Sequence, residues 1–429
     1  MDYQEAIDFL YPLHRFGIKP GLDRIHRLLE VLGHPERKLG RVVHIAGTNG
    51  KGTVAACMAS IFQAAGRKTG LFTSPHLVDF TERIRIDGRQ ISKEKIADYC
   101  SLLKPEVVSS GATFFEVTTA IALAFFAEEG VDASVIETGM GGRLDATNVV
   151  PGDIIIIPSI GLEHTAWLGD TIRKIAAEKA AIVKPGSRVY TAVQDGEGFD
   201  EIANAAARCE APLQVAGRDA SFGVRSVQPG QLDLDVRLAS GETRSLKAQL
   251  TGSFHATNVL LAVMAARYEG IGWDAVESGL MKLSETGYRA RLEQVADRPC
   301  VMLDVSHNPV GMSKTVEALC EIRSSFRDLY VLIGVAGDKD AAGMVLELGS
   351  LASMAVTVEL PTERTLPAEE LGELCRQAGI PEVRICRSSA DGLDMLVSVA
   401  GPEDLILVTG SFYLAGELAA SGRWPGSER

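Results

Sequence analysis

Short apolar runs alternate with amphipathic stretches over most of the chain. In the first half, the runs that predict buried strands are Val42–Ala46, Thr69–Phe72, Ala133–Glu137, Ile154–Ile160 and Val189–Val193. The stretches with helical spacing between them are Lys51–Ala65, Lys93–Leu103, Phe115–Glu128 and Thr171–Val183. Strands separated by helices favour βαβ units and a parallel sheet. The run of isoleucines that begins at Ile154 fits a central strand covered on both faces.

The pattern changes between Ser221 and Leu250. There Gln231–Leu238 reads QLDLDVRL, in which polar and apolar residues alternate. This period of two predicts an antiparallel ribbon with one face in water. Helical spacing returns at Asn258–Tyr268 and Trp273–Leu283.

A second alternating series begins near Arg291. Its predicted strands are Val301–Val305, Tyr330–Val335, Ala355–Glu359, Val383–Cys386 and Leu405–Thr409. We place the domain boundary in the polar, glycine-containing stretch Glu285–Gly287. The prediction is therefore two α/β domains, residues 1–286 and 287–429, with the larger one first.

Composition narrows the class of protein. The 429 residues are 46% hydrophobic and 23% charged, a balance typical of a globular protein with a large core. The net charge of −13 and the lack of a Lys/Arg block argue against nucleic-acid binding. No apolar run approaches the roughly 18 residues that a membrane span needs. Seven scattered cysteines and an acidic N-terminus without an apolar core predict a cytoplasmic protein with reduced thiols.

The segment RVVHIAGTNGKGT carries the first chemical motif. A predicted strand runs into glycines and then into a helix that opens at Lys51, so backbone N–H groups and the positive helix end face one spot. Lys51 adds a charge for terminal phosphates, and Thr53 offers a hydroxyl to phosphate or Mg²⁺. The alternative is a glycine-rich turn with a solvated lysine. The position between strand and helix favours an ATP site formed by Gly47, Thr48, Asn49, Gly50, Lys51, Gly52 and Thr53.

The second motif is VIETGMGGRLDATN at residues 135–148. Glu137 ends a buried strand, where a carboxylate is costly unless it meets a cation. An acid at the tip of a strand next to a phosphate loop commonly serves Mg²⁺. The glycines allow close approach of a ligand, and Asp145 and Thr147 supply polar contacts. The alternative is a glycine-rich loop with an internal Arg143–Asp145 pair.

The third motif contains His164 and Lys179. His164 follows the predicted strand that ends at Ile160, and Lys179 lies in the helical stretch beside Glu178. A lone histidine is usually structural, and Mg²⁺ prefers oxygen ligands. From the residues alone, Lys179 is interpreted as a surface ion-pair residue.

Four short segments of the second domain form the last set: RARLE, LDVSHNP, GVAGDKD and TGSFY. Three of them follow predicted strands. Asp304, His307, Asp338 and Ser411 are therefore expected along the carboxyl edge of one sheet, where open α/β sheets bind ligands. Together they predict a second ligand-facing surface aimed at the phosphate loop.

These motifs together resemble the folylpolyglutamate synthase/dihydrofolate synthase family of the Mur ligase superfamily. The resemblance follows the chain in order and is carried by GLDRIHRLLEVLG at 21–33, HIAGTNGKGT at 44–53, TSPHLVDFTERIRIDG at 73–88, TFFEVTTA at 113–120 and LGDTIRKIAAEKAAIVKPG at 168–186. It implies a P-loop Mur-ligase central domain followed by a smaller Rossmann-like C-terminal α/β domain.

The resemblance also implies roles for single residues. Ser74, Glu137 and His164 fall at positions where the family coordinates Mg²⁺, and two ions are expected. Lys179 falls on a lysine that the family often carries as a carbamate, an anion able to support the second ion.

Further roles concern the nucleotide and the other substrates. Asn258 and Arg291 align with residues near the nucleotide base and phosphates. Asp304 and His307 align with a pair that closes over ATP and substrate, so that Lys51, Lys179, Asp304 and His307 form the expected catalytic set. Substrate contacts are expected from Phe115, Glu116, Asp145, Thr147, His307 and Ser411.

The activity implied is the ATP-dependent addition of L-glutamate to a folate or dihydropteroate carboxylate through an acyl phosphate, by a monomer. The sequence departs from the family pattern at Ala290, where glycine is usual, at His255, where glutamine is usual, and at Glu163, where aspartate is frequent. The motif Asp304-Val305-Ser306-His307-Asn308 also differs from the usual DGAHN. These departures concern the walls of the pocket and leave the acceptor open.

Three alternatives remain. A Mur-type ligase could act on a non-folate carboxylate. A P-loop regulator could bind nucleotide without catalysis, although the chain lacks an N-K-x-D guanine signature and has a second ligand-facing domain. A dehydrogenase fits less well, because the loop carries Lys51 and lacks G-x-G-x-x-G.

Overall fold

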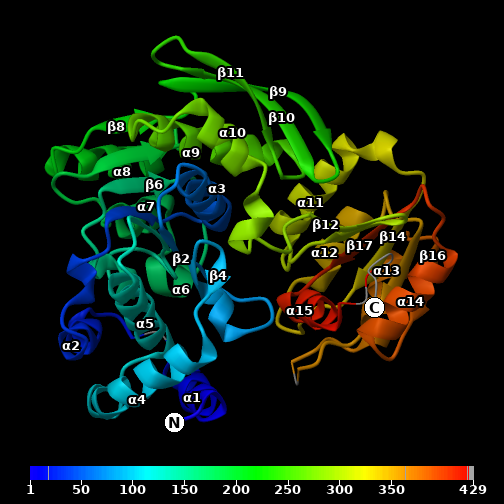
Figure 1. The fold of residues 1–429 in the computed structure, drawn as a ribbon. Coiled ribbons are helices and arrows are strands. Elements are labelled where there is room, and N and C mark those ends of the chain that lie inside the picture. The colour runs from blue at the N-terminus through cyan, green and yellow to red at the C-terminus, as the bar shows by residue number, and fades with distance from the viewer. Residues whose placement is uncertain (18, 363, 423, 425–429) are drawn as a thin grey trace.

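The computed structural model describes residues 1–17, 19–362, 364–422 and 424, and consists of two α/β units beside a three-stranded ribbon (Figure 1). The first unit is built on an eight-stranded sheet with the order β4-β3-β2-β5-β1-β6-β7-β8. Its strands are β1 (Arg41–Ile45), β2 (Thr69–Phe72), β3 (Ile84–Ile86), β4 (Arg89–Gln90), β5 (Ala133–Glu137), β6 (Ile154–Ile157), β7 (Arg188–Thr191) and β8 (Leu213–Val215). All pairs are parallel except those made by β3 and β4.

Helices cover both faces of this sheet, as the near-continuous apolar strands predict. One face packs against α3 (Lys51–Ala64), α9 (Ala256–Tyr268) and α10 (Trp273–Leu280). The other packs against α1 (Tyr3–Leu10), α2 (Asp23–Val31), α4 (Lys93–Ser110) and α5 (Phe114–Glu129). Neighbouring residues of one strand serve different faces: Val135 lies in the first core and Ile136 in the second.

Several predicted element ends are wrong, and two of them have a clear physical reason. The strand expected to reach Ile160 ends at Ile157, because Pro158 follows and has no N–H for the ladder. The helix expected to stop at Leu103 continues to Ser110 with Pro105 inside it. Its apolar face stays buried through Val107, so tertiary packing offsets the cost of the proline.

The ribbon consists of β9 (Ala220–Gln228), β10 (Gln231–Leu238) and β11 (Thr243–Ala248), all antiparallel. Leu232, Leu234 and Val236 of β10 are fully buried in the core shared with α3 and α9, whereas the residues between them are partly exposed. The predicted one-sided ribbon is confirmed.

The second unit has a six-stranded sheet with the order β12-β13-β17-β14-β15-β16. The strands are β12 (Glu293–Asp297), β13 (Cys300–Leu303), β14 (Leu329–Ile333), β15 (Met354–Thr357), β16 (Glu382–Ile385) and β17 (Leu405–Thr409), and only β12 is antiparallel to its neighbour. The helices are α11 (Pro309–Glu321), α12 (Ala341–Leu348), α13 (Ala368–Gln377), α14 (Ser389–Val399) and α15 (Phe412–Ser421). Because β13, β17 and β14 are parallel neighbours, Asp304 and Ser411 lie at one carboxyl edge, as predicted.

The two units are joined by the stretch between η6 (Leu283–Thr286) and β12, and the predicted division between residues 286 and 287 falls there. That exact division stays a prediction. The connection is conformationally unusual, because Ala290 and Leu292 have φ values of 56° and 48°. The units also touch where Gly416 of α15 meets Leu77: a Cβ on Gly416 would lie 2.3 Å from the Leu77 carbonyl oxygen.

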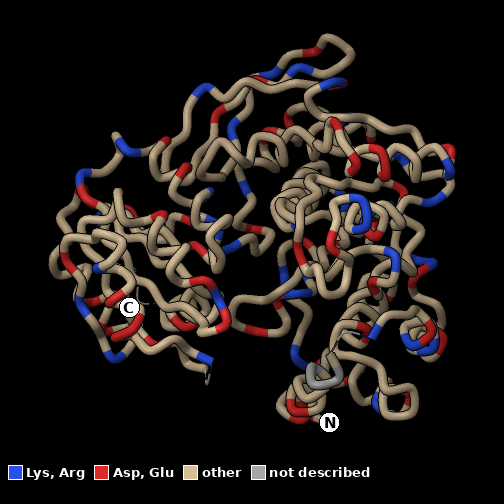
Figure 2. The backbone as a smooth tube through the Cα atoms, turned by 180° about the vertical axis from the view of Figure 1, so that it is seen from behind, with Lys and Arg blue, Asp and Glu red and all other residues tan. Residues whose placement is uncertain are grey.

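Charged residues of both signs alternate along the described part of the chain. Figure 2 shows Lys/Arg and Asp/Glu interspersed along both units. Among the described residues, no helix is long and apolar enough to cross a bilayer.

Candidate active site

The phosphate loop follows β1, which lies between β5 and β6 at the centre of the first sheet. The backbone N–H groups of Thr48 and Asn49 donate to the carbonyl oxygen and Oγ of Ser159, at 3.0 and 2.9 Å, so the loop after β6 fixes the shape of the phosphate loop. The helix α3 then starts at Lys51 without a side-chain cap. Uncapped N–H groups in the first turn of a helix attract an anion.

Gly50 is a position where only glycine fits. Its φ is 88°, and a Cβ there would lie 2.3 Å from Oδ1 of Asn258. Asn258 is buried in α9 and therefore packs directly against the phosphate loop. This contact places the predicted nucleotide residue Asn258 beside the predicted phosphate site.

Two ammonium groups share one carbonyl oxygen of the loop. Lys51 donates to the Gly47 oxygen at 2.8 Å and to the Thr48 oxygen at 3.1 Å, and Lys179 donates to the Gly47 oxygen at 2.9 Å. Lys179 is only 1% exposed and also pairs with Glu163, so its interpretation as a surface residue is wrong. Burial and the charge of Lys51 lower the pKa of Lys179, although Glu163 opposes this shift.

Glu137 ends β5 and is paired in register with Ile45 of β1. Its Oε2 accepts the backbone N–H of Ser74 at 3.1 Å. Burial raises the pKa of Glu137, opposed by Lys51, the Ser74 N–H, Arg291 and Arg83. No ion pair reaches Glu137 from the described lysines, arginines or histidines. A buried carboxylate beside a serine hydroxyl fits a hard cation such as Mg²⁺.

His164 is not brought to these two residues. It is exposed, has a φ of 45° and precedes the short helix α6 (Thr165–Leu168). Over the part of the chain that the structure describes, no contact joins His164 to Glu137 or Ser74. Nor do three His, Cys, Asp or Glu side chains there form a metal-binding group.

In the second unit, Asp304 is held by its own surroundings. It accepts hydrogen bonds from the N–H of Leu292 at 3.2 Å, the N–H of Ser306 at 2.9 Å and the hydroxyl of Thr315 at 3.0 Å. The Leu292 bond ties the interdomain connection to the carboxyl edge of the second sheet. Asp304 thus positions the segment that carries Arg291.

His307 directly follows Ser306, which belongs to this network. Its Nδ1 is 2.9 Å from the carbonyl oxygen of Val305. A carbonyl can only accept, so Nδ1 carries the proton and Nε2 is left for another partner. The imidazole ring lies 5.8 Å from the ring of Phe412.

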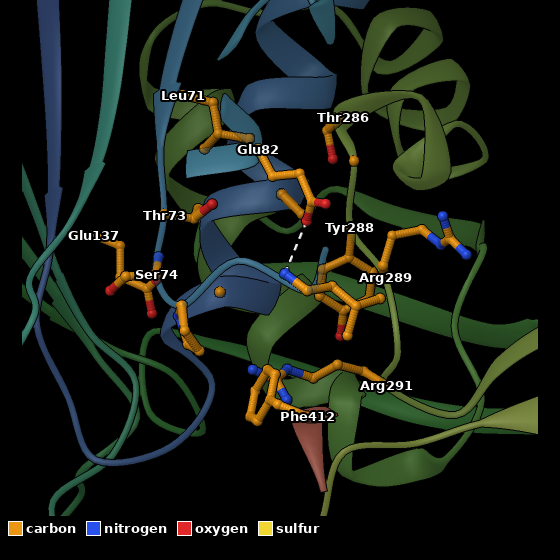
Figure 3. A pocket seen from close by; sticks show the side chains of 15 residues that line it. Leu71, Thr73, Ser74, Glu82, Glu137, Thr286, Tyr288, Arg289, Arg291 and Phe412 are labelled. Carbon is orange, nitrogen blue, oxygen red and sulfur yellow. Dashed lines mark hydrogen bonds between the residues drawn. The ribbon is translucent and has the colours of Figure 1, made fainter. Parts of the chain in front are cut away.

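A small cavity of about 70 Å³ lies where the two units meet (Figure 3). Ser74 and Glu137 line it from the first unit, and Arg291 and Phe412 line it from the other side. The guanidinium of Arg291 is 5.8 Å from the Phe412 ring centre. Tyr288 also lines the cavity, and its hydroxyl is 2.9 Å from that of Thr53. The phosphate-loop helix is therefore connected to the interdomain segment.

A second, larger cavity of about 550 Å³ adjoins the first, because Ser74 and Pro75 line both. Its walls are largely apolar and aromatic. Its lining residues are Leu13, Gly17, Lys19, Pro20, Ser74, Pro75, Arg83, Thr113, Phe114, Phe115, Glu116, Gly139, Met140, Arg143, Leu144, Asp145, Ala146, Trp167, Leu168 and Glu178.

Arg83 is a buried, charged lining residue that the sequence reasoning missed. Its side chain is 7% exposed, and burial lowers its pKa to about 10. Its Nε donates to Nδ1 of His76 at 2.8 Å, and its guanidinium lies 5.2 Å from the Phe114 ring centre. No carboxylate pairs with Arg83 among the described residues. The sequence offered little signal, because Arg83 is one of two arginines in the mixed segment FTERIRI.

The predicted substrate residues divide into two groups. Phe115 and Asp145 line the large cavity, and burial raises the pKa of Asp145. Glu116 also lines it, but its carboxylate accepts from Nε of Arg24 at 3.0 Å and from the N–H of Thr113 at 2.7 Å, which caps α5. Arg143 pairs with Glu178 at 2.9 Å, so the Arg143–Asp145 pair considered from the sequence is wrong.

Thr147 and Ser411 support other groups. The Thr147 hydroxyl donates to Asp145 and contacts Nε2 of His44 at 2.9 Å. Ser411 accepts the N–H of Tyr413 at 3.0 Å and caps α15. Neither is among the residues that line the two cavities.

His255 is a buried departure from the family pattern. Its ring lies 4.1 Å from the ring of Phe254, and burial lowers its pKa to about 3, so it is neutral near pH 7. Within the described residues neither ring nitrogen has a hydrogen-bond partner.

The family comparisons assign a class to this arrangement. The Mur ligase middle domain matches residues 45–266, and the Mur ligase glutamate ligase domain matches residues 290–412. The class is therefore that of the Mur ligases, which agrees with the phosphate loop and the two α/β units.

Individual relatives narrow the class further. The chain is 33% identical to dihydrofolate synthase/folylpolyglutamate synthase of Bacillus subtilis, over 97% of this chain and 98% of that protein. It is 35% identical to a probable bifunctional folylpolyglutamate synthase/dihydropteroate synthase of Haloferax volcanii, over 97% of this chain but only 50% of that protein. The chain thus spans about half the length of this haloarchaeal relative.

Solved structures of related proteins have a similar fold over nearly the whole chain. The structure of E. coli FolC in complex with DHPP and ADP matches with a TM-score of 0.84 and 29% identity, over 98% of this chain and 97% of the other. Mycobacterium tuberculosis folylpolyglutamate synthase, complexed with ADP and AMPPCP, matches with a TM-score of 0.86 and 30% identity, over 99% of both chains. The chain belongs to the folylpolyglutamate synthase/dihydrofolate synthase family, whose members are ATP-dependent ligases that form C–N bonds.

Proposed function

We propose that the chain joins L-glutamate to the carboxylate of dihydropteroate or a folate at the expense of ATP. The observation that carries this proposal is the junction of the two cavities at Ser74 and Pro75. One cavity has phosphate-handling groups around it, and the other has the aromatic walls that suit a pteridine. A carboxylate at the junction would reach a phosphoryl group on one side while its ring stays in the other cavity.

The nucleotide would lie along the phosphate loop. The uncapped start of α3, Lys51 and Arg291 would bind the phosphates, with Asn258 on the side of the base. Glu137 and Ser74 would hold Mg²⁺, which supplies charge neutralisation for phosphoryl transfer. Related structures carry ADP, AMPPCP or a manganese ion, which supports a nucleotide and a divalent metal here.

The acceptor would place its ring between Phe115 and Asp145 and its carboxylate near Arg83. Asp145 is a buried acceptor suited to the N–H groups of a pteridine, and Arg83 has no acidic partner among the described residues. Attack of the acceptor carboxylate on the γ-phosphate gives an acyl phosphate and releases ADP. The glutamate amine then displaces phosphate, forming the amide and giving up one proton.

The second unit would bring the incoming glutamate. Nε2 of His307 is left for another partner, and Ser411 is the buried N-cap of α15. Closure of the units would exclude water from the acyl phosphate. We expect the chain to act as a monomer.

Lys179 would act as a carbamate supporting a second Mg²⁺. Carbamate formation adds CO₂ to a neutral amine and releases a proton, and the lowered pKa of Lys179 favours that neutral amine. His164, which the structure leaves apart from Glu137, would join the metal site only after a change in the loop before α6.

An acceptor panel tests the proposal. Glutamate-dependent ADP release is measured with dihydropteroate, tetrahydrofolate and unrelated carboxylic acids, and the products are identified by mass spectrometry. One glutamate added to dihydropteroate indicates dihydrofolate synthase, and successive additions to tetrahydrofolate indicate folylpolyglutamate synthase. Activity only on an unrelated acid would replace the proposal with a Mur-type ligase of another substrate. Nucleotide binding without ADP release from any acid would indicate a regulator instead.

A further inference from the structure

His44 is a buried histidine that the proposed reaction does not use. It lies in β1, just before the phosphate loop, and its side chain is fully buried. Its Nε2 is 2.9 Å from the hydroxyl oxygen of Thr147. We propose that His44 is a positioning residue, which acts through Thr147 to orient the Asp145 carboxylate toward the acceptor. This inference rests on the proposed function, since it concerns how the acceptor of that reaction is held.

The hydrogen bonds around Asp145 determine which atom donates at each step. The backbone N–H of Met140 donates to Oδ2 of Asp145 at 2.9 Å. The backbone N–H of Thr147 donates to Oδ1 at 3.0 Å, and the Thr147 hydroxyl donates to the same oxygen. A hydroxyl has one proton, so the Thr147 oxygen can only accept from His44. Nε2 of His44 therefore carries the ring proton, and Nδ1 carries none.

The surroundings of His44 keep its ring neutral. Burial and the charge of Lys184 lower the pKa of His44 to about 3, so the ring is uncharged near pH 7. Among the described residues, Nδ1 has no hydrogen-bond partner, and a Cβ on Gly152 would lie 3.9 Å from it. Leaving a buried polar atom unpaired costs free energy, so stability alone does not explain a histidine at this position.

The backbone around Thr147 is held independently of His44. The Lys184 ammonium donates to the carbonyl oxygens of Asn148 and Val150, the second at 3.0 Å. Loss of the His44 donor should therefore leave this loop in place and release only the Thr147 hydroxyl. The effect of His44 is then confined to the side chains of Thr147 and Asp145.

The Asp145 carboxylate is the group through which this effect reaches the acceptor. It lines the large cavity and is only 7% exposed. Because Thr147 donates twice to Oδ1, it fixes the rotation of the carboxylate about the Cβ–Cγ bond. A carboxylate with a fixed plane presents its remaining lone pairs in one direction, which lowers the entropy cost of binding.

The test compares His44→Leu with His44→Gln. Leucine fills the buried site without a donor, whereas the amide nitrogen of glutamine can donate in place of Nε2. Ser134→Ala is the matched control, because Ser134 is fully buried in the same sheet and its hydroxyl donates to the Leu39 carbonyl oxygen at 2.7 Å. Each variant is assayed for the KM of dihydropteroate, ATP and glutamate. Calorimetry gives the Kd of pteroate, the oxidised form of dihydropteroate, without ATP.

We expect His44→Leu to raise the acceptor KM and the pteroate Kd about 10-fold, equivalent to about 1.4 kcal/mol, with kcat and the other KM values within about two-fold. His44→Gln should stay within about three-fold of the wild type in both quantities. Ser134→Ala should lower the melting temperature and leave the acceptor KM unchanged. A purely structural role of His44 would give this last pattern in His44→Leu as well.

A double variant tests the route through Thr147. If His44 acts on Asp145 only through the hydroxyl, His44→Leu/Thr147→Val has the same acceptor KM as Thr147→Val alone. Nitrogen NMR with labelled histidine should show the Nε2–H tautomer for His44, assigned by the loss of its signal in His44→Gln. Additive effects in the double variant, or an Nδ1–H tautomer, overturn the inference.

The outcomes separate the inference from the proposed function. Wild-type turnover on folates with an unchanged acceptor KM in folded His44→Leu overturns the inference alone. If wild-type protein neither binds pteroate nor turns over any folate, the proposed function fails and the inference fails with it. If His44→Leu does not fold, the acceptor KM of Thr147→Val and the tautomer of His44 decide the question.

Discussion

The carboxyl edges of the two sheets use their polar groups differently. At the first edge, Glu137 is buried and, within the described part of the chain, accepts a hydrogen bond from a backbone N–H alone, and the start of α3 is uncapped. At the second edge, Asp304 accepts three hydrogen bonds from its own unit and Ser411 caps α15. At the first edge the polar groups are left available to charged ligands. At the second edge they form hydrogen bonds that hold the local backbone in place. Catalysis would then depend on the first edge for charge and on the second for position.

Replacement of the cation at the first edge tests this difference most severely. We expect Lys51→Ala to reduce glutamate-dependent ADP formation by about 1,000-fold or more, because transition-state charge stabilisation in a dry site is worth several kcal/mol. The measurement is coupled ADP release, with melting temperature as a check of folding. Lys314→Ala removes an exposed lysine paired with Glu317 and serves as control. Near-normal turnover in Lys51→Ala would show that the loop does not handle the reacting phosphate.

The second lysine sharpens the comparison. Lys179→Ala should lower kcat about 100-fold, since a lost electrostatic contact to the reaction costs about 3 kcal/mol. Carbon NMR with labelled bicarbonate should show a carbamate signal in the wild type that this variant lacks. Full activity of Lys179→Ala, or no such signal in the wild type, counts against the carbamate.

Glu137 gives a prediction on stability and pH. Because burial raises its pKa, its ionised form destabilises the fold, and this cost appears as the pH rises above the ordinary range of a glutamate. In the absence of Mg²⁺, Glu137→Gln should therefore melt a few degrees above the wild type at pH 7 and at the same temperature near pH 4. Adding Mg²⁺ should raise the melting temperature of the wild type only. If the difference in melting temperature between Glu137→Gln and the wild type does not change with pH, the raised pKa of Glu137 is contradicted.

The smallest effect is expected at the interdomain connection. Ala290 has a φ of 56°, where a Cβ is strained by about 1 kcal/mol, and its side chain is buried. Ala290→Gly should relieve this strain but raise the entropy of the unfolded chain, leaving a net gain of about 0.5 kcal/mol. Thermal melting measures this gain in stability, with Ala400→Gly as a control at an extended residue whose φ is −72°. A loss of stability in both variants would mean that the strain is absent.

Much of the fold was predictable because its strands are apolar runs separated by long helices. The short elements β3, β4, β8 and β12 were not found, since strands of two to five residues are too short to show a clear period. Within the site, the phosphate loop is local in sequence and could be located directly. The position of Arg83 in the wall of the large cavity depends on segments that meet only in the folded chain. The same holds for the junction at Ser74 and for the burial of Lys179 against Glu163.

Gly416 in α15 restricts how this chain can change during evolution. Glycine inside a helix lowers its stability by about 1 kcal/mol relative to alanine, so a helix alone would favour replacement. The Leu77 carbonyl in front of Gly416 forbids that replacement, because even a methyl group would push the two units apart. A library varied at this position should thus reject nearly every substitution, although Gly416 lies in none of the motifs that carry the chemistry. Rejection of substitutions at Gly416 would reflect the packing of the two units against each other and not the catalysed reaction.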